Sequence, residues 1–112
     1  MTGRGAYLAA ELDGWPDASR LADILRDGGL AVRVGRYSVR LDGFDAFAFR
    51  ELGGDLSGGS VDACHDSLPA LLAVSRRVSD ALAKAKVRHR FEIYSDAGEC
   101  AARLHFDWPR GA

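Results

Sequence analysis

Residues 87–108 have the sequence VRHRFEIYSDAGECAARLHFDW, and this stretch decides the fold that the chain is expected to adopt. It contains two runs in which apolar and polar residues alternate, a pattern typical of strands with one buried face. Gly98 lies between the two runs and accepts the positive φ that a hairpin turn usually needs. The stretch therefore predicts a β-hairpin whose turn is formed by residues 96–99.

The register of this hairpin follows from the requirement that both apolar sets face one core. A slip by one residue would turn a whole apolar set toward water, so an odd-numbered residue must pair with an even-numbered one. Three predicted pairs meet this condition, namely Ser95 with Cys100, Ile93 with Ala102, and Phe91 with Leu104. On the same reasoning Cys100 faces the core. His89 faces it too, and we interpret it as a satisfied, partly buried histidine.

The rest of the chain alternates between strand-like and helix-like patterns. We expect strands at 6–13, 30–34, 37–41 and 46–51, and helices at about 18–27 and 68–85. Asp17 is the expected N-cap of the first helix, and Ser67 or Asp66 that of the second. Gly28 and Gly29 are expected to end the first helix, since glycine readily adopts the left-handed conformation found after helices.

Glycine also predicts two connections. The Gly-Arg pair at residues 35–36 is typical of a two-residue type II′ turn, which would pair Val32 with Val39. Residues 53–60, GGDLSGGS, are half glycine and indicate a surface loop. This segment lacks both the GxGxxG pattern and the lysine of a P-loop, so it does not indicate a phosphate site. Residues 61–66 are expected to form an irregular or short extended approach to the second helix.

The predicted order of elements is strand, helix, three strands, helix and two strands. Two helices on one face of a mainly antiparallel sheet of about six strands make an α+β two-layer sandwich. The order β-α-β-β-β-α-β-β contains βαββαβ and resembles a ferredoxin-like core with extra strands. A division into two βαββ units, 7–41 and 46–108, stays open. The 112 residues suit one domain, residues 1–112.

The composition argues against several classes of protein. Of the residues 47% are apolar and the net charge is −1, which argues against disorder and against a dedicated nucleic-acid binder. The sequence shows no signal-peptide core and no membrane-spanning run, so we expect a cytoplasmic protein. Arginine greatly outnumbers lysine, which indicates a GC-rich bacterial genome. Cys64 and Cys100 have no CxxC spacing, and we interpret them as free thiols in a reducing compartment.

Cys64, His65 and Asp66, together with Asp62, form the one cluster of candidate ligands or nucleophiles. The cluster precedes a predicted helix, and a helix N-terminus activates a nearby thiolate. Zinc sites usually combine two close Cys/His pairs, which this sequence lacks, so we expect no metal and no cofactor. Helix capping by Asp66 and Ser67 is the simpler explanation of this segment.

The face of the predicted sheet opposite the helices carries mostly arginine. We expect the binding residues to be Arg33, Arg40, Arg88, Arg90, Tyr94, Arg103 and His105. Arginine and tyrosine are enriched at interaction hot spots, and the arginine fork suits carboxylate or phosphate groups. An equally weighted alternative is that an exposed sheet face needs polar residues whatever its function, with the arginine stems covering the sheet.

These observations predict a small bacterial protein-interaction or regulatory domain, of the adaptor or immunity type. It would use the arginine- and tyrosine-bearing face to hold an acidic protein partner. The chain lacks the catalytic motif sets that sequence alone can identify, so we do not expect an enzyme. Two alternatives stay open: nucleic-acid or anion binding on the same face, and a small enzyme centred on Cys64 and His65. A monomer and a homodimer both fit the sequence.

Overall fold

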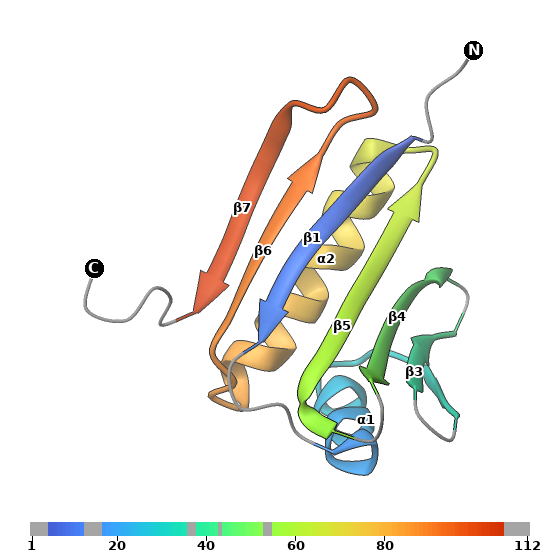
Figure 1. Cartoon of the computed structure of the whole chain (residues 1–112), viewed down its shortest axis with the longest axis vertical. Coiled ribbons are helices and arrows are strands. Elements are labelled where there is room, and N and C mark those ends of the chain that lie inside the picture. The colour runs from blue at the N-terminus through green and yellow to red at the C-terminus, as the bar shows by residue number, and fades with distance from the viewer. Residues whose placement is uncertain (1–4, 13–16, 36–37, 43, 53–54, 107–112) are drawn as a thin grey trace.

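The computed structural model describes residues 5–12, 17–35, 38–42, 44–52 and 55–106, without the side chains of 44–46 and 51–60. In chain order its elements are β1 (Ala6–Leu12), α1 (Ala18–Asp27), β2 (Val32–Val34), β3 (Ser38–Leu41), β4 (Phe44–Leu52), β5 (Asp55–His65), α2 (Leu68–Lys84), β6 (His89–Tyr94) and β7 (Cys100–Phe106) (Figure 1). The end of the predicted last strand, including Trp108, lies outside the described residues.

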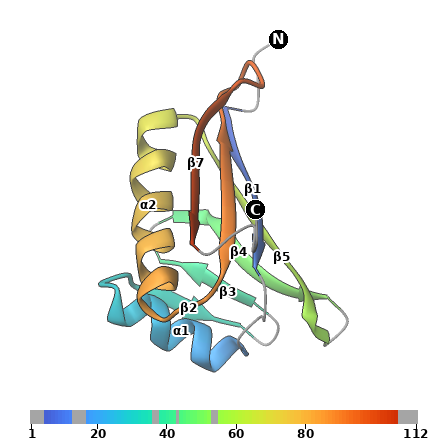
Figure 2. The same cartoon turned by 90° about the vertical axis from the view of Figure 1, so that its left-hand side faces the viewer.

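The seven strands form one sheet in the order β2-β3-β4-β5-β1-β6-β7, and every neighbouring pair is antiparallel. Both helices lie on the same side of this sheet (Figure 2). The predicted α+β two-layer sandwich is therefore confirmed. The ferredoxin-like core and its strand order are not confirmed and stay a prediction. Because β1 lies between β5 and β6, helix α2 carries the chain across β1.

The seventh strand is β5, and from Asp55 onward it corrects the prediction of a surface loop at residues 53–60. Of the two alternatives for residues 61–66, irregular or short extended, the extended one is confirmed up to His65. Phe49 pairs with Val61 and Arg50 with Ser60 along β4, and the register shifts beyond Arg50. A β-bulge of this kind accommodates an irregular, glycine-rich strand, because the partner strand satisfies its backbone groups. The glycine-rich segment carries no side-chain period, so its pairing could not be predicted from the sequence.

In the C-terminal hairpin, two of the three predicted pairs are confirmed: Phe91 with Leu104 and Ile93 with Ala102. The predicted pairing of Ser95 with Cys100 is wrong. The register shifts after Ile93, so that Tyr94 pairs with Cys100. This bulge places Cys100 on the same face as Tyr94, and the cysteine is exposed rather than directed to the core. Gly98 has the expected positive φ of 85°.

The predicted hairpin of β2 and β3 is present, but the predicted position of its turn, at residues 35–36, is wrong. Val34, not Val32, pairs with Val39, and the Gly35 amide donates a hydrogen bond of 2.7 Å to the Ser38 carbonyl. The register differs from the prediction by two residues. Because a shift of two keeps every side chain on its predicted face, the apolar pattern cannot distinguish the two registers.

The helices begin where their capping residues predict. Asp17 Oδ1 accepts a hydrogen bond of 2.8 Å from the Arg20 amide, and Ser67 Oγ accepts one of 3.2 Å from the Ala70 amide. Their apolar faces cover the inner face of the sheet. The largest fully buried apolar side chains are Phe47, Phe49, Phe91, Leu21, Leu25, Leu71, Leu82 and Ile93. Among the described helices, none combines the length and apolar character that crossing a bilayer requires.

Candidate functional site: the sheet face opposite the helices

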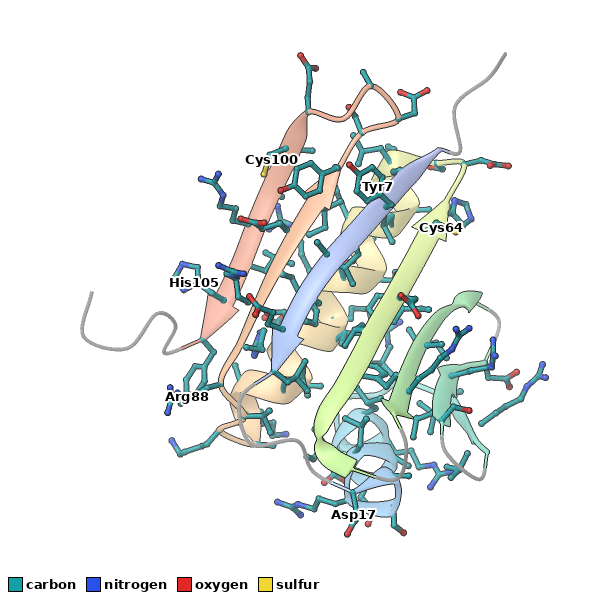
Figure 3. The ribbon with its side chains drawn as sticks, viewed as in Figure 1. Tyr7, Asp17, Cys64, Arg88, Cys100 and His105 are labelled. Carbon is teal, nitrogen blue, oxygen red and sulfur yellow. The ribbon has the colours of Figure 1, made fainter. Side chains whose placement is uncertain are left out.

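The helices leave the other side of β5, β1, β6 and β7 without a covering layer of described secondary structure (Figure 2). We call this surface the open face. Its outward side chains include Tyr7, Glu11, Asp62, Cys64, Arg90, Glu92, Tyr94, Cys100, Arg103 and His105. Figure 3 views this face, with Tyr7 and Cys64 on adjacent strands and Cys100 and His105 on β7. Because sheet neighbours in register share a face, these residues form rows across the strands.

The first row contains a stacked pair of aromatic rings. Tyr7 on β1 pairs with Tyr94 on β6, and their ring centroids lie 5.1 Å apart with an interplanar angle of 12°. Tyr7 is 41% exposed, which makes it one of two large hydrophobic residues exposed among the described side chains. Tyr7 also pairs with Cys64 on β5, and Tyr94 pairs with Cys100 on β7. We call the line Cys64, Tyr7, Tyr94 and Cys100 the tyrosine row.

The Tyr94 hydroxyl donates a hydrogen bond of 3.0 Å to Glu92 Oε1. This hydrogen bond is the largest cause of a raised pKa for the Tyr94 hydroxyl, and the nearby Cys100 and Tyr7 add to it. Tyr94 is therefore a neutral hydrogen-bond donor at neutral pH, and its ring is held in place from two sides.

The charges on the open face are paired across strands. Arg90 on β6 forms an ion pair with Glu11 on β1, and Arg103 Nε on β7 lies 3.5 Å from Glu92 Oε2. Arg90 and Glu11 are about half exposed, with 45% and 53% of their side chains accessible. Exposed pairs of this kind contribute only about 0–1 kcal/mol, so they are cheaply rearranged when another charged surface arrives. The open face therefore carries both signs of charge instead of an excess of arginine.

The predicted binding residues do not form a single patch. Arg90 and Tyr94 on β6 lie beside Arg103 and His105 on β7, with Arg90 directly opposite His105. Arg88 lies in the segment between α2 and β6, at one end of this group (Figure 3).

Arg33 and Arg40 face each other on β2 and β3, at the other end of the sheet. Strands β4, β5 and β1 separate them from β6, so they cannot share a small partner with Arg90. Arg33 Nε lies 3.0 Å from Asp42 Oδ1, which gives this edge its own ion pair.

Sequence reasoning missed three residues of this face. The sequence predicts only an irregular or short extended segment around Asp62 and Cys64, and it predicts a core position for Cys100. The alternation of Val61, Asp62, Ala63 and Cys64 is the signal that could have revealed the end of β5, since Val61 and Ala63 are buried. No comparable signal marks Cys100, because its orientation depends on the bulge after Ile93.

Cys64 and His65 are neighbours on a strand, where successive side chains point to opposite faces. His65 Nδ1 accepts a hydrogen bond of 2.8 Å from the Ser67 amide, at the entry to α2. The interpretation of Ser67 as a capping residue is confirmed. Within the described part of the chain, no group of three or more His, Cys, Asp or Glu side chains could hold a metal ion.

His89 is completely buried between the sheet and α2, as its inward position predicted. Its Nε2 lies 2.6 Å from Ser79 Oγ and its Nδ1 lies 2.9 Å from the Val87 carbonyl oxygen. A ring that donates from Nδ1 and accepts at Nε2 satisfies both contacts as neutral imidazole. Burial lowers the pKa of His89, although the bond to Val87 opposes this shift. The role of His89 is therefore structural.

A hollow lies on the helix side of the sheet, between α2 and the edge formed by β2 and β3. It has a volume of about 550 Å³ and is lined by Gly29, Leu30, Ala31, Leu41, Asp42, Ala70, Ala73, Val74 and Arg77. Its two charged residues are already engaged, since Arg77 donates to the Gly29 carbonyl at 2.8 Å and Asp42 pairs with Arg33. This hollow offers a ligand less polar recognition than the open face.

Comparison with known proteins finds no matching family model, no matching curated protein and no matching solved structure. The fold and the open face therefore define this protein only as an α+β sandwich with both described helices on one side of its sheet.

Proposed function

We propose that this protein is a non-enzymatic interaction module that binds a protein partner through the open face. The observation that carries the proposal is the stacked pair of rings formed by Tyr7 and Tyr94. Figure 3 shows Tyr7 on the side of the sheet away from α2. Tyrosine supplies a large, rigid contact area at low cost in side-chain entropy, and it is enriched at binding hot spots.

The charges of the open face change the kind of partner that we expect. The sequence predicts an acidic partner, because arginine dominates the outward positions. The pairing of Arg90 with Glu11 and of Arg103 with Glu92 supports a partner that presents both signs of charge. The same pairing gives little support to nucleic-acid binding, which depends on arginine and lysine that are available to phosphates.

The enzyme alternative has less support. Strand geometry directs Cys64 and His65 to opposite faces, whereas a thiolate nucleophile needs its base within hydrogen-bond reach.

Affinity capture with two charge-reversal variants tests the proposal. Arg90→Glu changes an ion-paired, half-exposed arginine on the open face. Arg26→Glu is the matched control, because Arg26 is 52% exposed on α1 and lies 4.0 Å from Asp23. We expect Arg90→Glu to lose the proteins that wild type captures from a lysate of its source organism, and Arg26→Glu to retain them. Equal capture by both variants would contradict the proposal.

A further inference from the structure

The residues of the open face form a symmetric pattern. It appears when each row is read from β5 to β7 and then in the reverse direction. The tyrosine row runs Cys64, Tyr7, Tyr94 and Cys100 over β5, β1, β6 and β7. It has cysteine at both ends and tyrosine at both middle positions. The order of residue types is therefore the same whether the row is read from β5 or from β7.

Charged residues elsewhere on the open face also come to lie against opposite charges when the order of the strands is reversed. In one row, Glu11 on β1 lies in register with Arg90 on β6. Reversal places glutamate against arginine at both positions. On the two outer strands, Asp62 lies two residues before Cys64 on β5, and Arg103 on β7 pairs with Glu92 on β6. Reversal again places opposite charges together.

Two copies that pack sheet to sheet can be related by a two-fold axis parallel to the strands and midway between β1 and β6. This axis reverses the order of the strands in the second copy. Strand β1 of one copy then faces β6 of the other, and β5 faces β7. Such an interface is isologous, which means that the same patch is used on both subunits. From this self-complementarity we propose that the partner of the open face is a second copy of this chain, packed sheet to sheet about that axis.

In this dimer Tyr7 of each copy faces Tyr94 of the other, and Glu11 of each copy faces Arg90 of the other. The inference rests on the proposed interaction function and names its partner. The patch covers four strands and three rows, about 15 Å by 15 Å, so the two copies together contribute roughly 450 Å², which is well below the area that stable protein interfaces bury. We therefore expect a weak, concentration-dependent dimer.

Charge-swap variants test the pairing of Glu11 with Arg90 by sedimentation velocity. Glu11→Arg alone places arginine against Arg90 at two contacts, and Arg90→Glu alone places glutamate against Glu11. Each single variant should dimerise at least about tenfold more weakly than wild type, because like charges in contact oppose association. An equimolar mixture of the two variants restores opposite charges at both contacts and should dimerise as wild type does.

The mixture also controls for folding, since a misfolded variant would not be restored by mixing. A wild-type chain that stays monomeric up to millimolar concentration would overturn the inference. So would single variants that self-associate as strongly as wild type, which would assign the contact to another surface.

The two exposed cysteines test the direction of the axis. Within one chain Cys64 and Cys100 are separated by three strand spacings, about 14 Å, too far for a disulfide. Across the proposed interface Cys64 faces Cys100 of the second copy. A bismaleimide with a span of about 10 Å, the usual separation of stacked sheets, should therefore cross-link wild-type dimers.

Cys64→Ser alone and Cys100→Ser alone should give no cross-linked dimer, whereas their mixture should give one. A cross-link within either single variant would overturn the proposed axis. The proposed function is tested separately. A monomeric chain whose Arg90→Glu variant still loses captured proteins would keep the interaction module and remove only the homodimer.

Discussion

At the scale of single residues, two buried serines on α2 differ in their hydrogen bonding. Ser79 Oγ lies 2.6 Å from Nε2 of the buried His89. Ser75 Oγ is also buried, and within the described residues it has no hydrogen-bond partner. A buried polar group without a hydrogen-bond partner destabilises the folded state, because its loss of water is not compensated. Removal of one partner from a buried hydrogen bond destabilises the folded state for the same reason, because the other partner is left unsatisfied.

We therefore predict opposite effects of two alanine substitutions one helical turn apart. Ser75→Ala should raise the free energy of unfolding by about 0.5–1 kcal/mol, because it removes the unpaired hydroxyl and improves helix propensity. Ser79→Ala should lower it by about 1–3 kcal/mol, because it leaves Nε2 of His89 buried and unpaired. Urea denaturation measures both changes. A Ser75→Ala variant destabilised as much as Ser79→Ala would show that the Ser75 hydroxyl has a stabilising contact.

At the scale of secondary-structure elements, both helices end in the same way. After α1 the Leu30 amide donates to the Leu25 carbonyl at 3.0 Å, and after α2 the Val87 amide donates to the Leu82 carbonyl at 2.9 Å. Each is the six-to-one hydrogen bond of a Schellman motif, which needs a left-handed residue just before the donor. That residue is Gly29 after α1, with φ of 86°, but Lys86 after α2, with φ of 63°.

The second ending can therefore be improved. Lys86→Gly should raise the free energy of unfolding by about 1 kcal/mol, since a left-handed backbone costs a side-chain-bearing residue about that much. Gly29→Ala is the reciprocal control and should lower it by a similar amount. A Cβ at Gly29 would meet its nearest atom, on Arg77, at an ordinary 3.5 Å. The comparison thus isolates backbone conformation. Thermal denaturation of both variants checks the signs, and a destabilised Lys86→Gly would contradict this account.

At the scale of the whole molecule, His89 links global unfolding to pH. Its pKa is lowered in the folded state, chiefly by burial, whereas unfolding returns it to about 6.5. Above about pH 6.5 both states are neutral at this site and its contribution to stability is complete. As the pH falls below that value, the unfolded state binds a proton that the folded state excludes, so stability is lost until the lower folded pKa is reached.

We predict that the free energy of unfolding falls with a slope of up to about 1.4 kcal/mol per pH unit in this window. In His89→Gln the part of the slope due to His89 should disappear, because no proton is taken up there. Ser75→Ala changes no titratable group and should keep the wild-type slope. Urea denaturation between about pH 8 and pH 5.5 measures the three slopes. Identical slopes for His89→Gln and wild type would remove His89 as the source of the effect.

Local sequence patterns are sufficient to predict the two helices and their capping residues, the two hairpins, and the face on which Phe91, Ile93 and Val39 lie. These features depend on local propensity and on side-chain period, which act over a few neighbouring residues. Most of the open-face residues could be predicted for the same reason, because outward parity follows from inward parity. Arg90, Tyr94 and Arg103 are examples.

Three features can be seen only in the three-dimensional structure. The glycine-rich segment belongs to strand β5, and β1 lies between β5 and β6. Cys100 lies on the same face of the sheet as Tyr94. The structure also shows that Arg33 and Arg90 lie at opposite ends of one sheet. Strand order and bulges depend on backbone hydrogen bonds between residues far apart in the chain, and these bonds are nearly independent of side-chain identity. The side-chain pattern of one segment therefore does not predict which other segment it pairs with.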